Sequence, residues 1–295
     1  MKKPTLTVGI PAYNEEKNIT RLVASIIAQK EDVSSISQVI IISDGSTDNT
    51  IKCLEKIKSS KLIVINGKKR LGQAERQNQI IKLMHKNDNY LLILEADTLP
   101  KSNTFISNMV KEAIKHPHFS VITCTKDVIE SKTSFGKIMD FGFRFRFAIF
   151  EHAMNFPNLY LFNTGLISKG FLSKFKWETE YHDDSYLYRK SLLSGYPILH
   201  VRSSVLQHKS VDNLNDYLLQ SGKFQKAKKN ESKISGIYNQ DYQLLAAIKI
   251  IFSYFLKNPF YFCIYLLILG FGRIYALFLP EYTKFWKIYK STKNI

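Results

Sequence analysis

Cysteine is scarce in this sequence, with three residues in 295. Cys53, Cys124 and Cys263 share no spacing typical of a metal site or of a disulfide framework. We therefore interpret them as ordinary thiols of a reducing compartment, with buried packing as their expected role.

Acidic residues are also few, since 25 Asp and Glu stand against 42 Lys and Arg and leave a net charge of +17. Such an excess predicts an anionic partner: nucleic acid, an anionic membrane surface or a phosphorylated substrate. Charge alone does not choose among these. The hydrophobic content of 45% is enough for a folded core, which excludes a disordered chain.

A signal peptide is not indicated. The first residues, MKKPTLTVGIPAYN, carry two lysines, but the apolar stretch that follows is short, is interrupted by Pro11 and has no small-residue cleavage site. We expect the functional part of the protein to face the cytoplasm.

Apolar β-branched runs alternate with segments of helical period up to about residue 126. We expect helices around 72–85 and 103–115, and a helix that begins at Asn14 with this side chain as its cap. Strands are expected at 6–10, 39–42, 62–65, 90–94 and 121–123. This alternation predicts an α/β, Rossmann-like fold whose mostly parallel sheet has helices on both faces and binds ligands at the carboxyl ends of its strands.

Residues 127–180 break this regularity with the aromatic-rich run FGFRFRFAIFEHAMNFPNLYLF, which carries Arg144 and Arg146. Aromatic residues interleaved with arginines could stack on nucleic-acid bases, line an acceptor groove or lie along a lipid interface. A plain packed helix is the fourth interpretation.

Two apolar segments follow at 244–256 and 260–279. The first is too short to span a bilayer and the second is about long enough, but Arg273 interrupts it and lysines flank both sides. We expect two interfacial helices or a shallow hairpin on anionic lipid, with a soluble pair of core helices as the alternative.

Three acids follow predicted strands: Asp44 after one, and Glu95 and Asp97 after another. Because converging carboxylates repel, they favour a divalent cation, and Mg²⁺ or Mn²⁺ commonly combines carboxylates with substrate phosphates. A phosphate-bearing ligand would also explain Arg70 and Gly72.

The segments VGIPAYNEEKNI, VIIISDGSTDNT, RLGQAERQNQII and LLILEADTLP, in this order and spacing, resemble the nucleotide-sugar-binding half of a family 2 glycosyltransferase with the GT-A fold. The resemblance covers roughly residues 4–230. It implies that Glu95 and Asp97 replace the Asp-X-Asp motif, with Asp97 on the metal and Glu95 near the ribose or metal. The implied donor-binding residues are Pro11, Ala12, Asn14, Glu15, Asp44, Ser46, Arg70, Gly72, Glu95 and Asp97.

The segment YHDDSYLYRKSLLSGYPI resembles the acidic catalytic motif of this family. The resemblance implies that Asp184, preceded by Asp183, is the general base, although a helix cap would use the same residues. LLQSGKF resembles a degraded Gln-x-x-Arg-Trp motif, which implies that Gln220 and Lys223 hold the donor diphosphate.

We therefore expect a GT-A catalytic domain over 1–235, with a nucleotide-sugar half at about 1–126 and an acceptor half at about 127–235, and a membrane-associated helical segment over 236–295. The expected reaction is inverting transfer from a UDP- or GDP-linked sugar to a hydroxyl acceptor, lipid-linked, at the cytoplasmic membrane face. A polyprenyl-phosphate glycosyltransferase is the alternative. A nucleic-acid-binding module is less favoured, because the positive charge is spread through the chain, and no nucleic acid is expected as a partner.

Overall fold

The computed structural model describes residues 3–152, 164–178, 183–221, 243–278 and 290–293, without the side chains of 183–185 and 290. Its contacts group the chain into two compact units. The first contains 1–126 and 161–207, and the second contains 127–160 and 208–294. The domain boundaries expected from the sequence, at about residues 126 and 235, stay predictions.

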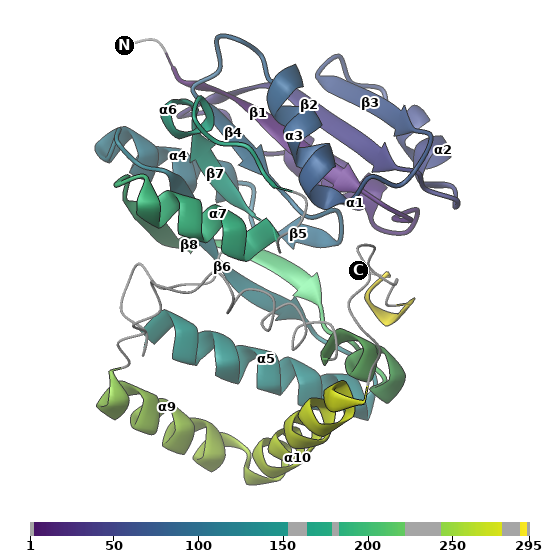
Figure 1. Ribbon diagram of the computed structural model, residues 1–295, viewed down its shortest axis with the longest axis vertical. Coiled ribbons are helices and arrows are strands. Elements are labelled where there is room, and N and C mark those ends of the chain that lie inside the picture. Colours follow the sequence, from purple (N-terminus) through teal and green to yellow (C-terminus); the bar gives the residue numbers. More distant parts are fainter. Residues whose placement is uncertain (1–2, 153–163, 179–182, 222–242, 279–289, 294–295) are drawn as a thin grey trace. The chain divides into compact units, whose positions relative to one another are not determined.

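The first unit is built on an eight-stranded sheet in the order β3-β2-β1-β4-β7-β6-β8-β5 (Figure 1). Its strands are β1 (Thr5–Ala12), β2 (Ser35–Asp44), β3 (Leu62–Gly67), β4 (Tyr90–Ile93), β5 (Thr98–Pro100), β6 (Val121–Ile129), β7 (Gly165–Ser168) and β8 (Ile198–Lys209). All five strands expected from the sequence are present, and four of them extend beyond the apolar run that predicted them.

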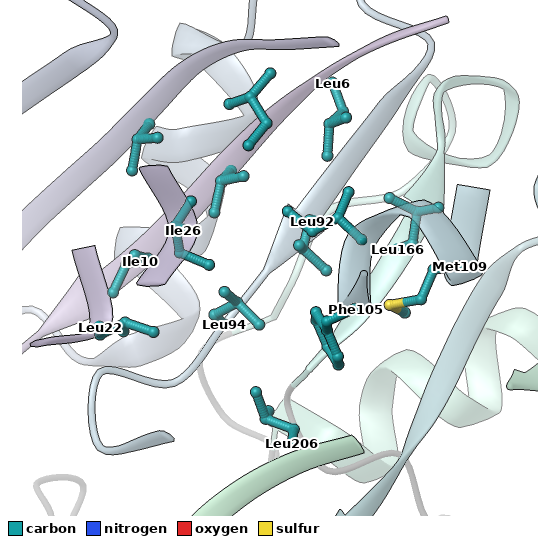
Figure 2. Packing of buried hydrophobic residues seen from close by; sticks show 14 of the residues in the cluster. Leu6, Ile10, Leu22, Ile26, Leu92, Leu94, Phe105, Met109, Leu166 and Leu206 are labelled. Carbon is teal, nitrogen blue, oxygen red and sulfur yellow. The ribbon is translucent and has the colours of Figure 1, made fainter. Parts of the chain in front are cut away.

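Successive side chains of each strand point to opposite faces of the sheet, and each face has its own hydrophobic core. In β4, Leu92 packs on one face, with Ile10 of β1, and Leu91 and Ile93 pack on the other. Figure 2 shows the first core, in which Leu92 and Leu94 lie beside Phe105 and Met109. Because both faces are apolar, helices must cover both.

The helices of this unit are α1 (Ile19–Ile27), α2 (Thr50–Glu55), α3 (Gln73–Leu83), α4 (Phe105–Lys115), α6 (Lys169–Leu172) and α7 (Asp183–Leu193). α1 and α4 bury their apolar stripes in the first core, whereas α3, α6 and α7 contribute to the second. The helices expected around 72–85 and 103–115 are confirmed as α3 and α4. The α/β fold with helices on both faces is therefore also confirmed.

The predicted start of the first helix at Asn14 is wrong. α1 begins at Ile19, and Asn18 occupies the cap position without a side-chain cap bond. Asn14 has φ +54 and bonds to a different loop, so the hydrogen bonds of the tertiary structure replace the local cap.

The sheet is also less regular than strict alternation predicts. β1, β2, β3 and β4 are parallel, but β7 lies antiparallel to both β4 and β6. β5 and β7, at three and four residues, are too short to give a period-two signal.

Apart from the last residues of β6 and β8, the described elements of the second unit are helical: α5 (Ser134–His152), a helical stretch over 214–221, α9 (Leu244–Lys257), α10 (Pro259–Leu277) and the short η1 (Lys290–Thr292). α5 contacts both α9 and α10. Phe145 of α5 packs on Phe262 and Tyr265, with ring centroids 5.3 and 6.4 Å apart. The aromatic run is thus a packed helix as far as His152, as one of the four interpretations expected, and its remainder, 153–162, lies outside the described residues.

The two apolar segments at the C-terminus form the helices expected there. α10 is the single helix in the described ranges that is long and apolar enough to cross a membrane, judged by length and composition alone. α9 buries no residue, and both helices expose large apolar side chains, of which Leu245 is 76% exposed and Leu267 73%.

Candidate active site

The carboxyl ends of three neighbouring parallel strands form one edge of the sheet. β2 and β4 flank β1 on its two sides, with Ala12 in register with Ser43 and Gly9 in register with Ile93. Parallel strands end at the same edge. The structure therefore brings Asn14, Asp44 and Asp97, from loops far apart in the sequence, to one side of the first unit.

The loop after β1 is hydrogen-bonded to the loop after β2. The Asn14 amide oxygen accepts from the Thr47 backbone N–H at 2.8 Å, and the Asn14 backbone N–H donates to Ser46 Oγ at 3.1 Å. Glu15 is buried, and its carboxylate accepts from Asn18 Nδ2 at 2.8 Å. Pro11 and Ala12, at the end of β1, are in register with Ile42 and Ser43, just before the DGSTD turn.

Asp44, the last residue of β2, accepts hydrogen bonds from the loop after β3. Its Oδ1 accepts from the Leu71 backbone N–H at 2.7 Å and from Arg76 Nε at 2.9 Å, and its Oδ2 accepts from the Gly72 N–H at 3.1 Å. Asp44 and Arg76 are buried, with side chains 7% and 5% exposed. Gly45, at φ +73, lets this loop approach, because a Cβ there would lie 2.9 Å from the Lys69 carbonyl carbon.

Arg70 connects this loop to the first one. Its guanidinium carbon lies 3.8 Å from the centre of the Tyr13 ring, a cation–π distance, and its Nε lies 3.8 Å from Asp44 Oδ2. Asn14, Asp44, Ser46, Arg70 and Gly72 therefore lie in three loops that contact one another, as the sequence predicts for a shared site.

Glu95 has a protein partner. Lys126 Nζ, on β6, donates to Glu95 Oε2 at 2.7 Å, and the lysine side chain is 4% exposed whereas Glu95 is 31% exposed. Glu95 therefore already has a cation beside it.

Asp97 lies two residues beyond Glu95 and is partly exposed. Within the described ranges no group of three or more His, Cys, Asp or Glu converges as a metal site. A Mg²⁺ or Mn²⁺ ion that is bound mainly by substrate phosphates needs only one or two carboxylates. The donor set fits such an ion through Asp97, with Glu95 committed to Lys126.

The remaining predicted site residues are less fully placed. Asp183 and Asp184 begin α7, and their side chains lie outside the described residues. Gln220 lies in the helical stretch over 214–221 of the second unit, and Lys223 lies outside the described residues.

Sequence reasoning missed three residues of the edge: Tyr13, Arg76 and Lys126. Arg76 is in the segment RLGQAERQN. An arginine on the apolar side of a predicted helix indicates a buried acidic partner. Lys126 is the one lysine inside the apolar run VITCTKDVI, and a lysine there needs a buried acid.

Cys124 lies two residues before Lys126. Burial raises the pKa of its thiol to about 12, although the positive charge of Lys126 opposes the rise. All three cysteines are free thiols, with Cys124 buried, Cys53 partly exposed and Cys263 exposed, so the expected burial is confirmed for Cys124 and wrong for Cys263.

A family model described as Glycosyl transferase family 2 matches residues 7–194, which contain the whole edge described above. Among curated proteins, a poly-beta-1,6-N-acetyl-D-glucosamine synthase of Staphylococcus aureus is 29% identical over 147 residues. That match covers 46% of this chain and 34% of the synthase, so the chain spans about a third of this relative.

Solved structures support the fold. The mannosyltransferase PcManGT from Pyrobaculum calidifontis, in complex with GDP-Man and Mn²⁺, gives a TM-score of 0.61 at 18% identity, over 94% of this chain and 74% of that one. S. aureus TarS 1–349 in complex with UDP-GlcNAc gives 0.55 at 15% identity, over 92% and 88%. At these identities the likeness concerns the fold alone.

Proposed function

The chain belongs to glycosyl transferase family 2 and has its GT-A fold, and we propose that it transfers a sugar with inversion from a nucleoside-diphosphate sugar to a hydroxyl acceptor. The acceptor is a lipid-linked saccharide or glycolipid, at the cytoplasmic face of the membrane. The product is a glycan of the cell envelope or another glycan.

The observation that carries this proposal is the contact among three loops at the carboxyl edge of the parallel strands. Asn14, Asp44 and Arg70 come from the ends of β1, β2 and β3, and hydrogen bonds and a cation–π contact connect them. An edge that holds the partly exposed Arg70 guanidinium and the partly exposed Asp97 suits a ligand with a planar base and a diphosphate.

On the donor side, Pro11, Ala12 and Asn14 form one wall of the site for the nucleotide base. Asp44 acts on the base through the loop after β3, which its hydrogen bonds hold in place. Glu95 contacts the ribose. Arg70, Gln220 and Lys223 supply positive charge or hydrogen bonds to the diphosphate. The donor nucleotide is UDP or GDP, the two found in complex with the related structures.

A divalent cation, Mn²⁺ or Mg²⁺, held by Asp97 would neutralise charge on the leaving diphosphate. Asp184 accepts the proton of the attacking hydroxyl, so the oxygen can form its bond to the anomeric carbon as the bond to the diphosphate breaks. Asp183 assists the base. This need for a base favours a hydroxyl acceptor over a polyprenyl phosphate, which is already ionised at neutral pH.

Membrane association is supported by the exposed apolar side chains of α9 and α10 and by the surrounding cations. Lys249 and Lys257 are exposed on α9, and residues 243–278 include no acid. Apolar residues beside cations suit the surface of an anionic lipid leaflet.

The proposed function is tested with a panel of UDP-, GDP- and dTDP-sugars, with and without Mn²⁺. One nucleotide should raise the thermal midpoint, because a ligand that binds only the folded state stabilises it. Asp184→Asn should then lower sugar transfer by about 10²–10⁴-fold, the usual contribution of a general base, with the donor-induced shift unchanged.

Asp183→Asn is the matched control, because it removes a neighbouring carboxylate on the same turn. It should lower transfer much less than Asp184→Asn. Full turnover in Asp184→Asn would refute the assignment of the base, and the absence of stabilisation by any nucleotide sugar would refute the donor class.

A further inference from the structure

The helices α9 and α10 of the second unit pack together as one pair. Both contact α5, and Figure 1 shows them on the same side of it. Asn258 is the single residue between them, and its Oδ1 accepts from the Tyr261 backbone N–H at 3.0 Å to cap α10. Phe255 of α9 and Phe262 of α10 touch beside this joint, with ring centroids 5.9 Å apart.

Protein covers one side of α10 from its first turn to its last. A Cβ at Gly272 would lie 2.7 Å from the Tyr217 ring, so the stretch over 214–221 covers this side where the aromatic contacts with Phe145 of α5 end. At 1.5 Å per residue, the covered length from 262 to 276 is about 21 Å. The buried residues of the helix are Phe262, Tyr265, Gly272 and Ala276.

The helix α5, which supplies much of this cover, is too polar to enter lipid. Arg144 Nε donates to Asp127 Oδ1 at 3.0 Å, so one of its charges is already committed to an ion pair outside the apolar contact. Charged side chains are costly in hydrocarbon. α10 is long and apolar enough to cross a membrane, but its packing on α5 opposes that orientation. The charged residues of α5 are Lys137, Asp140, Arg144, Arg146 and Glu151.

The opposite side of α10 is exposed and apolar. Leu267, Phe271 and Ile274 recur at intervals of four and three, which places these exposed side chains on one face of the helix. An exposed apolar surface of this length marks an interaction site. It continues on α9, whose large exposed apolar residues are Leu244, Leu245, Ile248, Ile251, Phe252, Phe255 and Leu256.

Cations border this apolar surface. Lys249 lies four residues after Leu245 and three before Phe252, so it shares their side of α9. Arg273 lies four residues before Leu277 on α10. Both cations are exposed, and residues 243–278 include no acid. Long basic side chains of this kind lay their stems on apolar surface and keep the charge in water or among head groups.

An anionic lipid leaflet is the occupant that satisfies both the apolar residues and the cations. A leaflet supplies acyl chains to the first and phosphate groups to the second. A second copy of the chain fits less well, because a symmetric dimer brings the same surface against itself. Lys249, Lys257 and Arg273 would then gather like charges, with no acid in 243–278 to pair with them.

We propose that α9 and α10 lie in the plane of the membrane, within one anionic leaflet, with α5 on their aqueous side and without a span by α10. The proposal deepens the proposed membrane association, on which it rests, by naming the surface and its orientation. It does not depend on the sugar donor, because the donor site uses other residues.

The first experiment measures how deep two nitroxide labels lie in vesicles of phosphatidylcholine and phosphatidylglycerol. Leu267→Cys and Leu277→Cys are labelled separately in the full chain with Cys53→Ser and Cys263→Ser, and relative access of oxygen and a water-soluble nickel complex gives the depth. Ten residues of helix rise about 15 Å, so a spanning α10 would separate the labels by about that depth. An in-plane α10 should place both at about 5–10 Å.

The second experiment measures vesicle affinity of variants on this surface. Leu245→Ser with Leu267→Ser should lower the affinity by about tenfold or more, because two apolar side chains no longer enter the leaflet. Ile27→Ser with Ile114→Ser is the matched control, because it removes two exposed apolar side chains from helices of the first unit. It should leave the affinity unchanged.

The cations are tested in the same assay. Lys249→Gln with Lys257→Gln should weaken binding to the anionic vesicles at low salt and should match the wild type at high salt, as expected for screened charges. All these positions are exposed, so each variant should keep the thermal midpoint of the wild type.

Label depths that differ by about 15 Å would overturn the in-plane orientation while membrane association stands. Equal losses in the two serine pairs would overturn the surface, and so would a stable dimer that forms without vesicles and requires Leu245 and Leu267. Absence of any vesicle binding would refute membrane association as well. Donor-induced thermal stabilisation, measured in parallel, separates each of these failures from failure of the proposed glycosyl transfer.

Discussion

Lys126 and Glu95 form an ion pair of 2.7 Å between β6 and the loop after β4, with the lysine almost fully buried. The sequence predicts Glu95 and Asp97 as metal ligands, which stays a prediction, and the structure places the Lys126 cation beside Glu95. We therefore expect a divalent ion to depend on Asp97, with Glu95 oriented by Lys126.

Removal of Lys126 should strengthen metal binding, whereas removal of a residue with a purely structural role would not. Lys126→Met leaves the Glu95 carboxylate without its cation and available to a divalent ion, so Mn²⁺ binding measured by calorimetry should strengthen by about tenfold, or about 1.4 kcal/mol. Asp97→Asn should abolish this binding.

Glu95→Gln provides the control for that measurement, because it keeps Lys126 and should not strengthen Mn²⁺ binding. Glu95→Gln combined with Lys126→Met should return the affinity to the wild-type value. Loss of Mn²⁺ binding in Glu95→Gln as large as in Asp97→Asn would contradict the assignment of a single ligand.

Asp44 should also contribute strongly to stability. Asp44→Asn leaves Arg76 charged and buried, so the free energy of unfolding should fall by about 3–5 kcal/mol. Denaturant unfolding measures this change. Lys61→Gln, which breaks the largely exposed pair with Glu31, should cost less than about 1 kcal/mol. Similar losses in the two variants would show that Asp44 does not organise the loop after β3.

Two glycines of α10, only two residues apart, should respond oppositely to alanine. Gly270 has no atom within 4 Å of an added Cβ, so Gly270→Ala should stabilise the helix by up to about 1 kcal/mol. Gly272→Ala places a methyl group 2.7 Å from the Tyr217 ring, so it should be destabilising by about 1–3 kcal/mol. Thermal unfolding of both variants checks the packing on Tyr217; stabilisation by Gly272→Ala would disprove it.

The cysteines should differ in reactivity according to burial. Since burial raises the pKa of Cys124 to about 12, its thiol stays protonated at pH 8, with roughly a thousandfold less thiolate than an ordinary cysteine. Iodoacetamide at pH 8 followed by mass spectrometry should label exposed Cys263 first and Cys124 only after unfolding. Early labelling of Cys124 would mean that β6 is not protected.

Much of the donor-side edge could be predicted from the sequence, because strands and the residues that follow them leave local signals. Asp44, Glu95 and Asp97 were placed correctly at strand ends, since a continuous apolar run stops where the strand leaves the core. The helix predicted from Asn14 was wrong for the opposite reason. Its first residues bond to positions about 33 further along the chain, which no local pattern contains.

The sequence by itself determined the α/β class, the strands that carry the site and the family, because short-range periodicity and ordered motifs specify them. Only the tertiary structure decided which acid has which partner. Asp44 pairs with Arg76 across 32 residues and Glu95 with Lys126 across 31. The sequence does not show whether a carboxylate binds a metal ion or pairs with a lysine. The order and spacing of the strands in the folded sheet decide which partner lies beside it.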